Sequence, residues 1–133
     1  MSVTVRILAI DEQEIILSSI AKALANTGDA RYTVATAQTA VDGLRLIRSN
    51  TYDLVFVEAY LPGMNTLEAL RRIRSISPAS SLVVLSGYIS GTSLLGEASE
   101  YIDGILSKPF TTEEITSLVS RILVERSGKG RSV

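Results

Sequence analysis

Short apolar runs alternate with amphipathic stretches along almost the whole chain. Five runs are typical of β-strands: Val3–Ile10, Tyr32–Ala37, Leu54–Val57, Leu82–Leu85 and Gly104–Leu106. The third and fourth runs are continuously apolar, as strands are when helices cover both faces of a parallel sheet. The chain is therefore predicted to form a doubly wound α/β sheet between two helical layers.

Helical periodicity fills the spaces between these runs. The last stretch shows it most clearly, with apolar residues at Ile115, Leu118, Val119, Ile122 and Leu123. We expect Thr39 to cap the second helix and Thr111 or Thr112 the last one, because threonine oxygens accept hydrogen bonds from free N–H groups at helix starts. A weaker helix is predicted over Thr92–Glu100.

The length of 133 residues fits one compact domain. We expect this domain to cover residues 1–126 and residues 127–133 to be a flexible tail or the start of a linker. No apolar run approaches the length of a bilayer span, and the N-terminus lacks a basic segment followed by an apolar stretch. The expectation is a cytoplasmic protein with no membrane partner.

Charge and residue types exclude several kinds of site. The formal net charge is −1, so direct binding to nucleic acid is not expected. Arg71, Arg72 and Arg74 are interpreted as a solvated helix face rather than a DNA contact. The chain has no Cys and no His, which excludes disulfides, thiolate nucleophiles and Cys/His zinc sites.

Polar side chains stand where the predicted strands end. Ligands of doubly wound sheets bind at this edge, so we expect its residues to form the functional site: Asp11, Glu12, Glu58, Ser86 and Lys108. The three carboxylates repel one another unless they share a cation, which is either Mg²⁺ or the Lys108 ammonium. An alternative for Asp11 and Glu12 is that they only cap the first helix.

These residues resemble the receiver domain of two-component response regulators, in which an Asp accepts a phosphoryl group from a histidine kinase. The resemblance covers nearly the whole chain and rests on the acidic pair, the third strand, the following turn, the switch Ser and the Lys-Pro-Phe signature: Asp11-Glu12, Tyr52–Glu58, Leu61-Pro62-Gly63-Met64, Ser86 and Lys108-Pro109-Phe110. It implies a flavodoxin-like (βα)5 fold with a five-stranded parallel sheet in the order 2-1-3-4-5. It also implies a cis peptide before Pro109.

The resemblance implies a metal site as well. Its ligands would be the carboxylates of Asp11, Glu12 and Glu58 and the backbone carbonyl of Tyr60. Because Glu58 replaces the family's Asp, we expect this site to bind Mg²⁺ weakly or not at all.

Three positions depart from the family's pattern. Glu58 stands where the family has its phosphoacceptor Asp, and one extra methylene displaces the carboxylate from the geometry of phosphoryl transfer. Ile105 stands at the family's aromatic switch position and cannot swing a polar ring. Asn65-Thr66 replaces a common Asp-Gly after the turn.

The departures predict a non-enzymatic signalling module in which Glu58 imitates or replaces phosphorylation. One alternative is an ordinary phosphoacceptor receiver in which Glu58 is an engineered replacement of Asp. Another is a flavodoxin-like cofactor binder, although the acidic first loop lacks a phosphate cradle. The expected partners are proteins, either a histidine kinase or a downstream output protein. They would dock on the face formed by the fourth helix, fifth strand and fifth helix, and a homodimer is a further expectation.

Overall fold

The computed structural model describes residues 4–25, 27, 31–87, 96 and 98–131. Its strands and helices, in chain order, are β1 (Thr4–Ile10), α1 (Glu14–Ala25), β2 (Arg31–Ala37), α2 (Ala40–Ser49), β3 (Leu54–Glu58), α3 (Thr66–Ile76), β4 (Ser81–Ser86), β5 (Gly104–Ser107) and α5 (Thr112–Arg131). The strands form one sheet in the order β2-β1-β3-β4-β5, and every neighbouring pair is parallel. The predicted fold class and strand order are confirmed.

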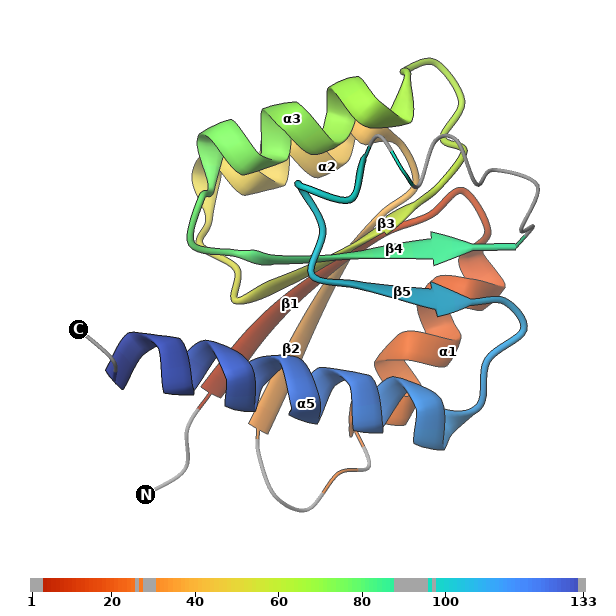
Figure 1. Cartoon of the computed structure of the whole chain (residues 1–133). Coiled ribbons are helices and arrows are strands. Elements are labelled where there is room, and N and C mark those ends of the chain that lie inside the picture. The colour runs from red at the N-terminus through yellow and green to blue at the C-terminus, as the bar shows by residue number, and fades with distance from the viewer. Residues whose placement is uncertain (1–3, 26, 28–30, 88–95, 97, 132–133) are drawn as a thin grey trace.

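Two helical layers enclose this sheet. Figure 1 shows α2 and α3 side by side over one face and α1 and α5 over the other. Each layer has its own buried cluster: Ile7, Leu24, Phe56 and Val119 belong to the cluster on the α1 and α5 side, and Leu8, Leu44, Val55 and Leu70 to the one on the α2 and α3 side. The alternation between the two clusters along β1 and β3 follows from side chains that point to opposite faces at successive residues.

The central strands have the composition that this position requires. All five residues of β3 and all six of β4 are buried. Such strands cannot alternate with polar residues, because helices cover both of their faces. The continuous apolar runs in the sequence therefore marked the middle of the sheet correctly.

The helix starts confirm two predicted caps. The Thr39 hydroxyl accepts a hydrogen bond from the Asp42 N–H at 3.1 Å. Thr111 accepts from the Glu114 N–H at 3.1 Å, and the Glu114 side chain accepts from the Thr111 N–H at the same distance. This reciprocal pair is a capping box, so Thr111 rather than Thr112 caps α5.

Two expected segments lie near the ends of what the structure describes. Residues expected as a tail from position 127 are helical up to Arg131, because α5 continues without a break. The helix predicted over Thr92–Glu100 lies largely outside the described residues, although Gly96 and Ala98 are helical. In the described part of the chain no helix is both long enough and apolar enough to cross a membrane.

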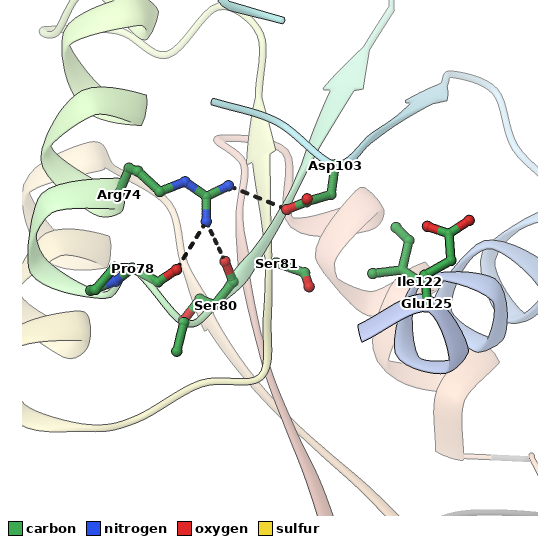
Figure 2. Close-up of a pocket in the computed structure, with 8 residues that line it drawn as sticks. Arg74, Pro78, Ser80, Ser81, Asp103, Ile122 and Glu125 are labelled. Atoms are coloured by element: carbon green, nitrogen blue, oxygen red, sulfur yellow. Dashed lines mark hydrogen bonds and ion pairs between the residues drawn. The ribbon is translucent and has the colours of Figure 1, made fainter. Parts of the chain in front are cut away.

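Arg71, Arg72 and Arg74 were predicted to form a solvated helix face, and this prediction is wrong for Arg74 at the amino edge of the sheet. Arg74, near the end of α3, extends toward Asp103 above the turn that carries Pro78 and Ser80 (Figure 2). Its guanidinium donates to the Ser80 carbonyl at 2.7 Å and to the Tyr101 carbonyl at 2.6 Å. Arg74 is a structural residue, whereas Arg72 fits the solvated interpretation, because its side chain is about half exposed and forms an ion pair with Glu68 on the same helix. A helical spacing of arginines in the sequence does not distinguish the two.

Candidate functional site

Four strand ends place the candidate residues at the carboxyl edge of the sheet. Asp11 follows β1, Glu58 ends β3, Ser86 ends β4 and Lys108 follows β5. Main-chain hydrogen bonds hold two of them in the sheet: the Asp11 N–H donates to the Ala37 carbonyl at 3.0 Å, and the Lys108 N–H donates to the Ser86 carbonyl at 2.8 Å. Strand pairing therefore holds the backbone from which the Asp11 and Lys108 side chains extend.

Lys108 joins the two buried carboxylates of this edge. Its Nζ lies 2.6 Å from Asp11 Oδ2 and also forms an ion pair with Glu58 Oε2. The exposed fractions of the three side chains are 12% for Lys108, 0% for Asp11 and 10% for Glu58. One cation thus faces two anions with little water between them, and each attraction amounts to about 4 kcal/mol before desolvation is subtracted.

This environment shifts the acid–base behaviour of the site. Burial and the neighbouring Asp11 raise the pKa of Glu58, and Lys108 opposes this rise only in part. Burial lowers the pKa of Lys108, but its contacts with Asp11 and Glu58 outweigh burial and raise that pKa overall. Lys108 therefore keeps its charge, whereas the Glu58 carboxylate is the group whose ionisation the site opposes.

Asp11 has two roles in the structure. Its Oδ1 accepts a hydrogen bond from the Gln13 N–H at 2.8 Å, just before α1 begins. Its other oxygen, Oδ2, is buried without a hydrogen bond and faces the Lys108 ammonium. The contact with the Gln13 N–H lies just before α1, and the contact with Lys108 places the other oxygen of Asp11 in the acidic pocket.

Glu12 lies apart from the pocket that Asp11 and Glu58 form. Its side chain is exposed, and its backbone carbonyl accepts a hydrogen bond from Gln38 Nε2 at 3.1 Å. Across the described residues there is no group of three acidic side chains that could hold a metal ion. The oxygens of Asp11 and Glu58 are of the kind that Mg²⁺ prefers, but Lys108 already lies between them.

The remaining predicted residues differ in their surroundings. Ser86 is buried and pairs with Ser107 of β5. Ile105 in β5 is 44% exposed, so its side chain lies on the surface beside the sheet edge. The Lys108–Pro109 peptide is cis, as the resemblance implied. Tyr60, whose carbonyl was expected as a metal ligand, has a half-exposed side chain in the loop after β3.

Sequence reasoning missed two residues that shape this edge. Gln13 Oε1 accepts a hydrogen bond from Lys108 Nζ at 3.4 Å. The Thr66 hydroxyl donates to the carbonyl of Ala59, the residue directly after Glu58. Nothing in the sequence indicated a role for Gln13. Thr66 was noted as a departure from the family's pattern, but no role was predicted for it.

The sequence model of a family described as "Response regulator receiver domain" matches residues 7–120. The chain belongs to the response regulator receiver family. This membership replaces the alternative of a flavodoxin-like cofactor binder. Receiver domains are modules of two-component signalling that interact with kinases and output domains.

Curated relatives agree with this membership. "Response regulator MprA" of Mycobacterium sp. (strain KMS) is 30% identical over 119 residues, which cover 90% of this receiver domain and 50% of that protein. The corresponding protein of Mycobacterium ulcerans (strain Agy99) is 28% identical over 120 residues, again about half of its length. The chain therefore spans about half the length of the curated relatives that it matches.

Solved structures agree with the fold. The receiver domain from Methanospirillum hungatei JF-1, described as CheY-like, superposes with a TM-score of 0.83 at 23% identity, covering 96% of this chain and 99% of that one. The signal receiver domain of an HD domain-containing protein from Pseudomonas fluorescens Pf-5 gives a TM-score of 0.81 at 27% identity, covering 97% and 93%. The chain thus has the same fold as these receiver domains.

Proposed function

We propose that this receiver domain works as a phosphorylation-independent interaction module, in which the Glu58 carboxylate substitutes for a phosphorylated Asp. The observation that carries the proposal is the contact of Glu58 with Lys108 at the end of β5. A glutamate at the end of β3 extends one methylene further than an aspartate. Its charge therefore engages the lysine that, by the family resemblance, would otherwise meet a phosphoryl group.

The same extra length opposes phosphoryl transfer to this chain. An acyl phosphate forms only when the attacking carboxylate oxygen, the cation and the phosphorus are aligned to within about 0.5 Å. Glu58 is also ion-paired with Lys108, so attack would require this pair to open. We therefore propose that the domain is not an enzyme and does not catalyse its own phosphorylation.

Metal binding is proposed to be weak or absent at this site. Mg²⁺ would have to bind beside the Lys108 ammonium, which already neutralises one of the two buried carboxylates. Glu12 is exposed and contributes no third carboxylate to the pocket. Lys108 thus supplies part of the positive charge that two adjacent carboxylates require.

The proposed partners are a histidine kinase or a downstream output protein, and a second copy of the chain is a further candidate. Ile105 and Val124 are exposed apolar residues of β5 and α5, with exposed fractions of 44% and 71%. Isolated exposed apolar residues are common, so the proposed docking on this face rests on the family resemblance as well. We also propose a cytoplasmic location and no direct contact with nucleic acid.

A beryllofluoride titration tests the proposal, because beryllofluoride with Mg²⁺ imitates a phosphoryl group bound to Asp. The chain and its Glu58→Asp variant are titrated side by side, and backbone amide NMR reports the response. We expect amide shifts around Ser86 and Lys108 in the variant only. The Glu58→Gln variant serves as a matched control that keeps the side-chain length and removes the charge.

Phosphorylation by a small phosphodonor is the decisive counter-test. Stoichiometric acyl-phosphate labelling of the unmodified chain at Glu58 would overturn the proposal. A response of Glu58→Asp alone agrees both with a natural glutamate and with an engineered one, since both have the same chemistry. No response of either chain would contradict the idea that Glu58 alone disables the site.

A further inference from the structure

The first residue of α3 is tied to the strand ends that carry the acidic pocket. Thr66 is buried, and its hydroxyl donates a hydrogen bond to the Ala59 carbonyl. Ala59 follows Glu58 directly, and its N–H donates to the Leu85 carbonyl of β4 at 2.8 Å. Any displacement of the chain just after Glu58 therefore acts on the beginning of α3.

The other end of α3 holds the residues that lead into β5. The Arg74 guanidinium donates to the Tyr101 carbonyl at 2.6 Å and to Asp103 Oδ2 at 3.2 Å. Figure 2 shows this side chain spanning from α3 to Asp103. Asp103 Oδ2 also accepts from the Leu82 N–H at 2.8 Å, which fixes the carboxylate against the start of β4.

A second arginine on the same side of α3 adds to this attachment. Arg71 Nε lies 3.3 Å from the Tyr101 hydroxyl, and its guanidinium carbon lies 5.9 Å from the centre of the Tyr101 ring. Residues three apart in a helix share one side, so Arg71 and Arg74 hold the same segment together. The segment Tyr101–Asp103 is thus bound through a ring, a main-chain carbonyl and a carboxylate.

The helix between these attachments is suited to move as one body. Ala69, Leu70 and Ile73 are buried against the sheet. The eight-residue separation of Thr66 and Arg74 corresponds to about 12 Å along the axis of a hydrogen-bonded helix. Close packing makes such an element stiff, so both ends shift together.

We propose that α3 is a mechanical link that carries a displacement of the loop after Glu58 to the segment Tyr101–Asp103, and from there to the exposed Ile105 of β5. This route requires no rotating aromatic side chain, which Ile105 cannot provide. The link is independent of whether Glu58 accepts a phosphoryl group, so it stands or falls separately from the proposed function.

The experiment removes the hydrogen bond between Thr66 and Ala59 and measures the response of residues 101–107. Thr66→Val removes the hydroxyl at nearly constant volume, and Thr66→Ser keeps it. In the full chain, backbone amide NMR and hydrogen exchange are recorded for residues 101–107. We expect Thr66→Val to shift these amides and to lower their protection by about threefold or more, whereas Thr66→Ser leaves them close to the parent.

Removal of the Arg74 contacts tests whether the effect reaches residues 101–107 through α3 or through the strands of the sheet. Arg74→Lys removes the forked contact. Arg72→Lys is the matched control on the same helix, because Arg72 pairs with Glu68 of that helix and not with the segment Tyr101–Asp103 in the described part of the chain. In the Arg74→Lys background, Thr66→Val should no longer alter residues 101–107. In the Arg72→Lys background it should alter them as before.

Two results would overturn the link. One is an effect of Thr66→Val confined to residues 59–68. The other is an undiminished effect at residues 101–107 when Arg74→Lys is present, since β3, β4 and β5 would then carry it. Thr66→Ala provides the same test if Thr66→Val does not fold.

Discussion

The two edges of the sheet each hold a cation among polar groups, and they do so in different ways. At the carboxyl edge, Lys108 faces the carboxylates of Asp11 and Glu58. At the amino edge, Arg74 donates to the main-chain carbonyls of Ser80 and Tyr101 and to a single carboxylate. The first edge has an excess of negative charge, whereas the second is balanced mostly by neutral dipoles.

This difference follows from the two side chains and indicates their roles. A guanidinium is a rigid fork whose donors match several fixed acceptors at once, so Arg74 fastens three segments in one geometry. An ammonium is a compact charge on a flexible stem, and its position responds to the charges around it. A site that has to respond to a change of charge is therefore expected at Lys108, and a fixed scaffold at Arg74.

Removal of the Lys108 charge should change the free energy of unfolding more than any other substitution at the two edges. Lys108→Met leaves Asp11 and Glu58 buried without a cation, and we expect the free energy of unfolding to fall by about 3 kcal/mol. Urea denaturation at pH 7 measures this change. The matched control is Arg48→Met at an exposed position of α2, where we expect a change within about 0.5 kcal/mol.

A second substitution tests the cause of that loss. Asp11→Asn in the Lys108→Met background removes one of the uncompensated charges and should restore part of the stability. If the double variant were no more stable than Lys108→Met, the loss would come from packing of the lysine stem instead of from charge.

Removal of the Arg74 fork should have a smaller effect. Arg74→Met leaves the carbonyls of Ser80 and Tyr101 without their donor, and we expect a loss of about 2 kcal/mol in the free energy of unfolding. Arg72→Met, which breaks only a surface ion pair with Glu68, should cost about 0.5 kcal/mol or less. Equal losses for the two variants in urea denaturation would contradict the distinction between them.

Replacement of Glu58 should have the smallest effect, which is a change in how the free energy of unfolding depends on pH. Burial and Asp11 raise the pKa of Glu58, so the folded chain binds this proton more tightly than the unfolded chain does. The contribution of Glu58 to stability is then fully present below its unfolded pKa and is lost as the pH rises through the folded pKa. In Glu58→Gln the free energy of unfolding should therefore decline less steeply above about pH 4.

The size of this slope change is limited by one proton, to about 1.4 kcal/mol per pH unit. Urea denaturation between pH 4 and pH 8 measures it, and Glu12→Gln at an exposed position provides the control. A parent and a Glu58→Gln variant with parallel pH profiles would show that Glu58 ionises equally well in the folded and unfolded chains.

Much of the fold followed from periodicity. The apolar runs of β3 and β4 indicated a sheet covered on both faces, and Thr39 and Thr111 marked helix starts through their own hydroxyl groups. The end of α5 did not follow, because the polar residues beyond position 126 carry no apolar pattern from which a helix would be predicted. A pattern of apolar residues predicts a helix only where apolar residues are present.

The site was predictable only as a set of strand ends. Asp11, Glu58, Ser86 and Lys108 each stand at the end of a strand, and parallel strands bring their carboxyl ends to one edge. The sequence left open whether Mg²⁺ or Lys108 compensates the carboxylates. In the structure Lys108 forms ion pairs with both Asp11 and Glu58, while Glu12 turns to the solvent.

The sequence by itself determined the order of elements, the edge at which chemistry can occur and the presence of a glutamate at the end of β3. Only the tertiary structure decided which charges meet: Lys108 is 50 residues from Glu58, and Arg74 is 29 residues from Asp103. The physical reason is the sequence separation over which each kind of interaction acts. Periodicity and capping act between residues a few positions apart, whereas ion pairs depend on distances that exist only after the sheet has assembled.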